Sequence, residues 1–300
     1  MNVSLTAIQR LSLTFSSAIA LSLTLWGNPA LAGDPFRTNN PRNISDTTEA
    51  AFEAYFKYGN YPEAARQIEA AIAEGTNDPL ALSLRAALAF QRDDLAAFKS
   101  YADQTLAAAQ SLMSQDPLRG NLYTAIGHFL EGTHTFKTRG PIGAVSKLQE
   151  VLRYLQAAER VDPNDPELNI IKGYMDLLLA VNVPFVSADK AIANLQRNAA
   201  PSYLVNRGIA LAYRDLGEYD KAQTYIEKAL SETPNNPEVI YLQAQILHEK
   251  GKQNNQVTVV QQSVQLFDSA IAQKDQLPAA LIPQMERERR IAQEWLNENS

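Results

Sequence analysis

The fold is decided by residues Tyr203–Asn236, which read YLVNRGIALAYRDLGEYDKAQTYIEKALSETPNN. Apolar residues recur there at intervals of three and four, and Gly217 interrupts the pattern near its middle. This spacing predicts two amphipathic helices joined by a short turn. Small side chains at Ala210, Ala222 and Ala229 allow the two helices to pack closely. The stretch is therefore expected to form an antiparallel helical hairpin.

Nearly the same turn sequence occurs twice in the chain. Asp162–Pro166 reads DPNDP and Thr233–Pro237 reads TPNNP, 71 residues apart. That distance is close to two periods of about 34 residues, a spacing typical of helical-hairpin repeats. From Asp46 onward the apolar pattern is helical, and most prolines fall at turns or at the first position of a new helix. The sequence thus predicts a repeat protein without strands.

These residues resemble the tetratricopeptide repeat (TPR) family of antiparallel helix pairs. The positions that fit its pattern are Ile209, Ala210, Tyr213, Gly217, Tyr219, Ala222, Ile226, Ala229 and Pro234. Asn206 departs from the pattern, since it replaces the first aromatic residue. A second match is made by Ala51, Tyr55, Gly59, Tyr61, Ala64, Ile68, Ala71 and Ile72. The resemblance implies an all-α fold, a right-handed α-solenoid of about six TPR-like hairpins with a C-terminal capping helix.

The predicted repeats occupy residues 46–274, and residues 275–300 form the capping helix. Four repeats are irregular: the second helix of 79–113 overruns, 117–161 is long, 166–197 degenerates near its centre, and 237–274 carries an insertion. The run Leu168–Val183 is apolar but contains Lys172 and Asp176, so we expect a buried helix and not a membrane span. In the capping helix, the charged run Glu286–Arg290 is expected to face solvent.

The first 32 residues have the order of a secretory signal peptide. Arg10 is followed by the uncharged, largely apolar run Leu11–Trp26 and by Ala30-Leu31-Ala32, an A-x-A site. We expect cleavage between Ala32 and Gly33, with an uncleaved membrane anchor as the alternative. The mature chain would then begin with a flexible lead-in over residues 33–45, rich in Pro, Asn and Gly. The expected compartment is the periplasm, or a thylakoid lumen if the source has one.

Composition excludes several classes of function. The 300-residue chain has a net charge of −6, whereas a nucleic-acid-binding protein needs a basic surface. It has no cysteine, which removes disulfides, thiolate metal sites and cysteine nucleophiles, and which suits an oxidising compartment. No nucleic-acid partner and no transmembrane segment in the mature chain are expected.

Catalytic and metal-binding patterns are weak. His128, Glu131 and His134 form the one cluster suggestive of a metal, but six positions on a helix separate the two histidines by about 120°. The sequence lacks a phosphate-binding glycine loop, a G-x-S-x-G motif and a Ser-His-Asp set. The pair Asp93-Asp94 lies at a predicted turn, where helix capping accounts for it. We therefore predict no metal, no cofactor and no catalysis.

The resemblance places partner contacts on the first helix of each repeat, along a concave groove. The groove candidates are Glu49, Glu53, Phe56, Thr124, His128, Glu131, Tyr174, Arg207, Leu211, Arg214, Tyr241, Gln245 and His248. Arg207 and Arg214 lie two helical turns apart, so they could hold one carboxylate, or they could be solvated surface residues. Leu211 stands where chaperone-binding repeats carry an Asn for C-terminal carboxylates, which argues against that kind of recognition.

The leading hypothesis is an exported scaffold or adaptor that binds a protein or peptide partner in this groove without catalysis. The chain as a whole also resembles an exported TPR family of cyanobacteria whose members have no assigned activity. The alternative is an accessory subunit for envelope glycans, binding saccharide through Tyr174, Tyr241 and Glu131. An enzyme ranks third.

Overall fold

The computed structural model describes residues 33–182 and 187–299. In these ranges the chain forms α-helices, one short 3-10 helix and no strand, which confirms the all-α prediction. The helices are α2 (Asp46–Phe56), α3 (Tyr61–Ala73), α4 (Pro79–Gln91), α5 (Leu95–Leu112), α6 (Pro117–Arg139), α7 (Pro141–Val161), α8 (Pro166–Asn182), α9 (Ala188–Asn198), α10 (Ser202–Asp215), α11 (Tyr219–Glu232), α12 (Pro237–Gln253), α13 (Val257–Ile271) and α14 (Ile282–Asn299).

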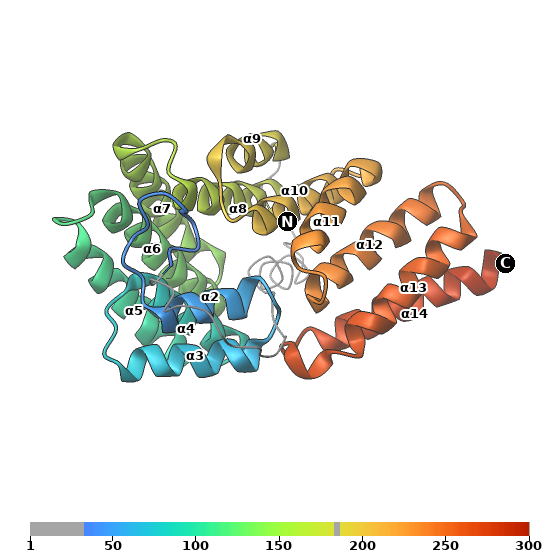
Figure 1. Cartoon of the computed structure of the whole chain (residues 1–300), viewed down its shortest axis with the longest axis horizontal. Coiled ribbons are helices and arrows are strands. Elements are labelled where there is room, and N and C mark those ends of the chain that lie inside the picture. Colours follow the sequence, from blue (N-terminus) through green and yellow to red (C-terminus); the bar gives the residue numbers. More distant parts are fainter. Residues whose placement is uncertain (1–32, 183–186, 300) are drawn as a thin grey trace. The chain divides into compact units, whose positions relative to one another are not determined.

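Consecutive helices pair into six hairpins, and α14 follows the last one (Figure 1). The pairs α4–α5, α6–α7, α10–α11 and α12–α13 pack along one another, and α14 packs on α13. In α8–α9, a Cβ added to Gly173 would lie 2.5 Å from the side chain of Leu195, so this hairpin needs glycine at its crossing. Six hairpins and a cap are the number that the sequence predicts.

The described chain divides into two compact units. The N-terminal unit holds residues 33–52 and 64–169, and the C-terminal unit holds residues 53–63 and 170–299. The hairpin of α2 and α3 therefore contributes to both units. The right-handed superhelix expected over the whole chain stays a prediction, as do the predicted repeat and cap boundaries.

Four first helices begin with the same local chemistry, an Asp or Asn followed by proline. The side chains of Asp78, Asp116, Asp165 and Asn236 accept hydrogen bonds from backbone N–H groups in the first turns of α4, α6, α8 and α12. Proline at the next position has a fixed φ that suits a first helical residue and lacks an N–H that would need a partner. The sequence thus fixes where each of these helices starts.

Each unit has apolar clusters between its stacked hairpins. In the N-terminal unit, Ala86, Ala89, Phe98, Ala102 and Leu130 from α4, α5 and α6 form one cluster. In the C-terminal unit, α10, α11 and α12 are joined by Ala210, Ala222, Ile226, Ala229, Val239, Leu242 and Ile246. A further cluster buries Phe267, Met285, Ala292 and Leu296 between α12, α13 and α14. Alanines at these crossings permit the close helix packing that the sequence predicts.

The turns inside two hairpins require glycine. Gly59 and Gly217 have φ angles of 77° and 74°, in the left-handed region that L side chains rarely adopt. Asp93 and Asn255 take the same conformation in the α4–α5 and α12–α13 turns, with φ angles of 56° and 52°. Asp and Asn tolerate this region better than most residues, so these turns close without glycine.

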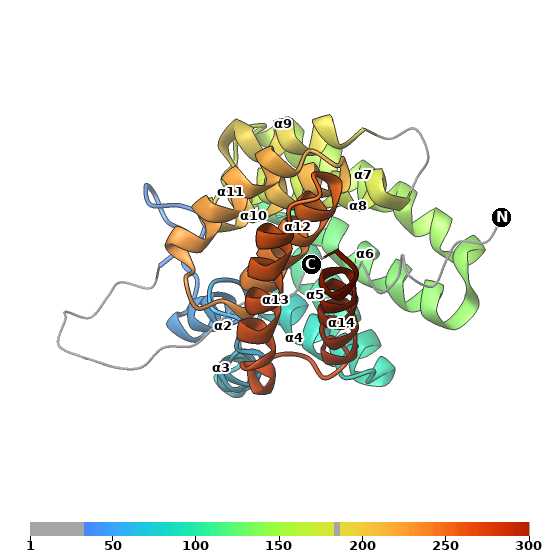
Figure 2. The ribbon, with the colours of Figure 1, turned by 90° about the vertical axis from the view of Figure 1, so that its right-hand side faces the viewer.

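The irregular hairpin lengths follow the sequence. The helices α6 and α7 have 23 and 21 residues, against 13 for α4, so the 117–161 unit is long as predicted. The turn between α6 and α7 stands clear of α4 and α5 in the same unit (Figure 2). Most of the apolar run 168–183 forms α8, where Leu168 and Leu177 are buried. No helix within 33–182 or 187–299 has both the length and the hydropathy needed to cross a bilayer.

The N-terminal stretch makes contacts that its composition does not predict. Residues 1–32, including the predicted signal peptide, lie outside the described part of the chain. Residues 33–45 were expected to form a flexible lead-in; that stays a prediction, and the structure adds contacts that anchor four of these residues. Phe36 and Ile44 are buried, and the Phe36 ring packs edge-on against Phe52 at 5.0 Å between centroids. Arg37 and Arg42 form ion pairs with Asp165. Apolar burial and charge pairing together hold a segment whose composition alone suggests mobility.

Candidate partner-binding face

A row of polar side chains runs across α10, α12 and α14 in the C-terminal unit. Arg214 Nη1 donates to Gln245 Oε1 at 2.6 Å, and Gln245 Nε2 donates to Glu288 Oε2 at 2.7 Å. The Tyr241 hydroxyl donates to the same Glu288 oxygen at 2.7 Å, and Arg214 also donates to Asp215. We call Arg214, Asp215, Tyr241, Gln245 and Glu288 the polar row.

Helix register accounts for this arrangement. Tyr241 and Gln245 are four residues apart on α12 and therefore share a face, while Arg214 reaches them from α10. Glu288 comes from α14, which occupies the place of a further first helix beside α12. The sequence predicts a solvated Glu286–Arg290 face, yet Glu288 is half-buried and accepts these hydrogen bonds.

The polar row remains accessible to solvent in part. The side chains of Arg214 and Asp215 are 19% and 26% exposed, and Gln245 and Glu288 are half-buried. Leu211 lies one helical turn before Arg214 and is also half-buried. A partner chain can therefore reach donors, acceptors and an apolar contact on one face.

His248 extends this face by one turn but is buried. Its Nδ1 lies 3.5 Å from Glu249 Oε1, and its Nε2 is buried with no hydrogen-bond partner within the described ranges. Burial lowers the pKa of His248, a shift that the nearby Glu249 opposes. The imidazole is therefore neutral at pH 7.

Arg207 and Arg214 do not share a carboxylate. Arg207 is 6% exposed, and its Nη2 donates to Glu238 Oε2 at 2.9 Å. Glu238 also accepts from the Tyr61 hydroxyl at 2.7 Å. Burial raises the pKa of Glu238 to about 8, although Arg207 and Tyr61 oppose that shift. The Arg207 side chain therefore makes an internal ion pair with Glu238, in the first turn of α12.

Two of the predicted aromatic contacts are also internal. Tyr174 is 7% exposed and donates to the backbone carbonyl of Leu204 at 2.9 Å. Tyr241 is 3% exposed, so only its hydroxyl takes part in the polar row. Burial raises the pKa of Tyr174 to about 12. Neither ring presents a face on which a sugar could stack, so the glycan alternative loses its aromatic support.

The candidates on α6 form a separate cluster in the N-terminal unit. Glu131 Oε2 lies 2.9 Å from His128 Nδ1 and accepts from Lys147 at 2.7 Å. The pKa of Glu131 is lowered overall, because the hydrogen bonds from Lys147 and His128 outweigh the opposing effect of burial. Thr124 is fully buried and donates to the carbonyl of Gly120. Within the described ranges no group of three or more His, Asp and Glu side chains could hold a metal.

The candidates on α2 fall in different units. Glu49 belongs to the N-terminal unit and accepts from the Gly33 N–H at 3.1 Å. Glu53 and Phe56 belong to the C-terminal unit, where Glu53 pairs with Lys57 at 2.6 Å and Phe56 packs on Tyr55. One continuous groove through all thirteen candidates therefore stays a prediction.

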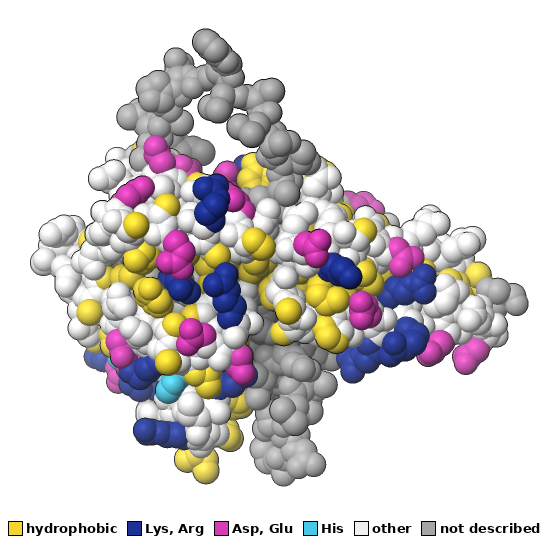
Figure 3. Space-filling view, turned by 90° about the horizontal axis from the view of Figure 1, so that it is seen from below, with side chains coloured by type: hydrophobic (Ala, Val, Ile, Leu, Met, Phe, Trp, Pro, Cys, Tyr) yellow, Lys and Arg dark blue, Asp and Glu magenta, His cyan; other side chains and the backbone are white. Residues whose placement is uncertain are grey.

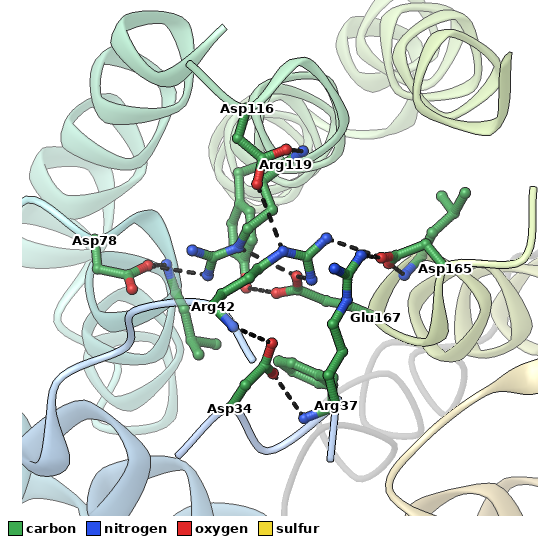
Figure 4. Close-up of polar contacts among 12 residues, drawn as sticks. Asp34, Arg37, Arg42, Asp78, Asp116, Arg119, Asp165 and Glu167 are labelled. Carbon is green, nitrogen blue, oxygen red and sulfur yellow. Dashed lines mark hydrogen bonds and ion pairs between the residues drawn. The ribbon is translucent and has the colours of Figure 1, made fainter. Parts of the chain in front are cut away.

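Sequence reasoning missed a buried ion network in the N-terminal unit (Figure 4). Arg42 and Arg119 both donate to Glu167 Oε2, at 2.7 and 3.2 Å, and the Tyr123 hydroxyl donates to Glu167 Oε1 at 2.5 Å. Arg42 and Arg37 also pair with Asp165. The caps Asp78 and Asp116 complete the network through Arg119 and Arg42. The repeated Asp-Pro dipeptide was the available signal, because stacked first helices bring their N-caps together.

In this network, burial and the neighbouring arginines shift the pKa values of the acidic groups in opposite directions. Burial raises the pKa of Glu167, although Arg119 and Arg42 oppose it. Burial also acts to raise the pKa of Asp165, but Arg37, Arg42 and the Leu168 N–H lower it overall. Arg119 keeps its charge despite burial, because Glu167 and Asp78 raise its pKa. A network with this many internal partners indicates a structural role.

Comparison with known protein families identifies one repeat in this chain. Residues 205–246 match the family described as tetratricopeptide repeat, and they cover α10, α11 and the first part of α12. The match includes Arg214, Asp215, Tyr241 and Gln245 of the polar row. The structure is similar to a crystal structure of a thermophilic TPR protein of Thermus thermophilus, at 22% identity and a TM-score of 0.42. That likeness covers 63% of this chain and 90% of the other. The search of curated proteins gives no match.

Proposed function

We propose that the chain is a scaffold that binds a peptide or protein segment along α10, α12 and α14, without a catalytic step. The observation that carries this proposal is the polar row, with its half-buried donors and acceptors beside Leu211. An extended peptide offers backbone N–H and C=O groups that such side chains can bind. The tetratricopeptide repeat match, which covers α10 and the first part of α12, supports the same use of that part of the surface.

The scaffold is further proposed to act after export. The A-x-A site before Gly33 motivates this, and one contact agrees with cleavage there: the Gly33 nitrogen lies 3.1 Å from Glu49 Oε2. Cleavage would turn that N–H into an α-ammonium group and the hydrogen bond into an ion pair. The periplasm is the proposed compartment, with a thylakoid lumen as the alternative. Mass spectrometry of the protein from the exporting cell tests it, since an intact residue 1 contradicts cleavage.

Site-specific photo-crosslinking tests the binding face. A photoreactive phenylalanine analogue placed at Leu211 should give a defined adduct in the native compartment. Arg214→Ala in the same background should abolish the adduct, because it removes the donor to Gln245. The matched control carries the analogue at Ser231, an exposed position on the second helix α11.

Two outcomes would contradict the proposal. Equal labelling from positions 211 and 231 would indicate nonspecific contact, and an adduct that survives Arg214→Ala would place the partner elsewhere. A saccharide adduct in place of a polypeptide would favour the envelope-glycan function.

A further inference from the structure

One helix carries most of the exposed apolar side chains of the described chain. Ile142 is 90% exposed, Val145 58%, Val161 51% and Leu152 39%, and all four lie on α7. The other large exposed apolar residues, Leu216 and Ile291, occur singly near the end of α10 and on α14. At 100° per residue, Ile142, Val145 and Leu152 fall within an arc of about 80°. Together they make an exposed apolar stripe that no other described helix of the N-terminal unit covers.

The same region is basic in an otherwise acidic protein. Between Glu131 and Glu150 the chain contains Lys137, Arg139 and Lys147 and no Asp or Glu, although its net charge is −6. Lys137 lies 3.6 Å from Asp93, and Lys147 pairs with Glu131. Arg139 is exposed at the end of α6 and makes no ion pair with any described residue.

Further along α7, Arg153 is 61% exposed and lies within about 20° of Ile142 around the helix axis. Arg153 pairs with Glu150 on the same helix. The outward face of α7 therefore combines three apolar side chains with the basic side chain of Arg153. This pattern is typical of helices that lie in the interface of a membrane.

The shape of the hairpin suits a flat surface. The α6–α7 turn projects beyond α4 and α5 (Figure 2), and apolar and basic side chains gather on the projection at the lower left of Figure 3. Gly140 and Pro141 form the turn, so Ile142 lies in the first turn of α7, where its side chain is exposed. A projecting tip reaches a planar surface before the remainder of its unit does.

We propose that Arg139, Ile142, Val145, Leu152 and Arg153, here named the α7 patch, dock on an anionic lipid surface. Ile142 and Val145 enter the boundary between headgroups and acyl chains, and Arg139 and Arg153 bind the headgroup phosphates. Charge favours lipid over a second copy of the chain, because a two-fold interface through this patch would set the arginines against one another. The inference goes beyond the scaffold function, and its test does not depend on the polar row.

A local fluorescence readout tests the docking. The chain has no cysteine, so Val145→Cys gives one site for an environment-sensitive dye. Vesicles of phosphatidylcholine with phosphatidylglycerol should shift the emission to the blue, and vesicles of phosphatidylcholine alone should shift it far less. The same dye at Ser111→Cys, an exposed position on α5 in the same unit, should not respond. Because the signal is local, binding through residues 1–32 would not mimic it.

Two substitutions in the labelled chain assign the contacts. Ile142→Ser should weaken the apparent vesicle affinity about tenfold or more, since an isoleucine side chain no longer leaves water. Arg139→Glu should weaken it on anionic vesicles and reduce its dependence on salt. Ile291→Ser removes an exposed isoleucine from α14 and should leave the affinity unchanged. All three side chains are exposed, so the variants should fold.

Three results would overturn the proposal. The first is no emission shift on anionic vesicles, and the second is an equal shift at positions 145 and 111. The third is a concentration-dependent dimer, detected by light scattering without lipid and lost in Ile142→Ser, which would assign the α7 patch to self-association.

Discussion

The two units contain two versions of one turn. Asp165-Pro166-Glu167 opens α8, and Asn236-Pro237-Glu238 opens α12. Both glutamates are buried, and each accepts hydrogen bonds from a tyrosine hydroxyl and from arginine. The two turns thus place a glutamate carboxyl group at the same point of two first helices.

They differ in the residue that caps the helix. Asp165 is charged and pairs with Arg37 and Arg42, whereas Asn236 is neutral and donates to the backbone carbonyls of Phe56 and Lys57 at 3.4 Å. Glu167 binds two arginines, and Glu238 binds one. The charged cap Asp165 therefore has two arginine partners, Arg37 and Arg42, that the neutral cap Asn236 lacks. The Asn cap binds backbone carbonyl groups, and the Asp cap binds arginines.

The largest effect is expected for Glu167→Ala. The substitution leaves the buried guanidinium of Arg119 and that of Arg42 without their shared carboxylate, which should cost about 3–5 kcal/mol. Urea denaturation followed by circular dichroism measures the change. Lys99→Ala, which removes an ion pair whose partners are 43% and 51% exposed, is the control and should stay within about 0.5 kcal/mol. Similar losses for both variants would contradict the difference drawn between buried and exposed pairs.

The second prediction concerns pH in the C-terminal unit. The pKa of Glu238 is raised from 4.5 to about 8, so the folded state holds a proton that the unfolded chain releases. Stability should therefore fall as the pH rises from 6.5 to 8, by up to about 1.4 kcal/mol per pH unit. Glu238→Gln should flatten this slope. Unfolding midpoints of both proteins across this range provide the measurement, and parallel slopes would argue against the assignment.

Below that range His248 should act in the opposite direction. Its pKa is lowered, so folding loses stability as the pH falls through the ordinary value of 6.5. For this reason the Glu238 test is confined to pH 6.5–8.

Exchanging the two capping residues tests the difference between the two turns. Asp165→Asn keeps an oxygen for the Leu168 N–H but removes the charge that holds Arg37 and Arg42. It should cost about 1–2 kcal/mol, since Arg42 retains Glu167. Hydrogen exchange over residues 33–45 should rise more than exchange in α8. The reciprocal Asn236→Asp adds a charge near Glu238 without an added arginine and should destabilise the C-terminal unit. A neutral or stabilising result there would contradict the role given to the cap.

A smaller stability effect than those of Glu167→Ala and Asp165→Asn is expected for Arg214→Ala. Its guanidinium is 19% exposed and its hydrogen bonds are partly solvated, so the loss should be below about 1 kcal/mol. Partner crosslinking from position 211 should nevertheless disappear. Thermal melting combined with the crosslinking assay separates the two effects, because unfolding alone would lower both together.

The helical fold was readable from the sequence because helix starts and packing crossings are local. Asp-Pro dipeptides, Gly217 and the alanine stripe of α11 each act within a few residues. The Asp-Pro dipeptides signal the capping carboxylates of the ion network but not its arginine partners, because Arg42 and Glu167 are 125 residues apart and only the stacking brings them together. The candidate groove residues differ in exposure: Arg214 and Gln245 lie in the polar row, whereas Tyr174 and Arg207 are buried. The position of a residue in its repeat predicts which face of the helix it lies on. Whether its side chain is exposed depends on the neighbouring hairpin, which the repeat pattern does not describe.

The anchored segment 33–45 acts as an intramolecular counterion. Stacking aligns the capping carboxylates of α4, α6 and α8, so each added hairpin adds negative charge at one edge of the N-terminal unit. Two of the arginines that balance it, Arg37 and Arg42, precede the first helix. A chain truncated to begin at α2 would keep those three caps and Glu167 but lose both arginines. The negative charge that accumulates with successive hairpins is therefore neutralised in part by a segment that contains no repeat.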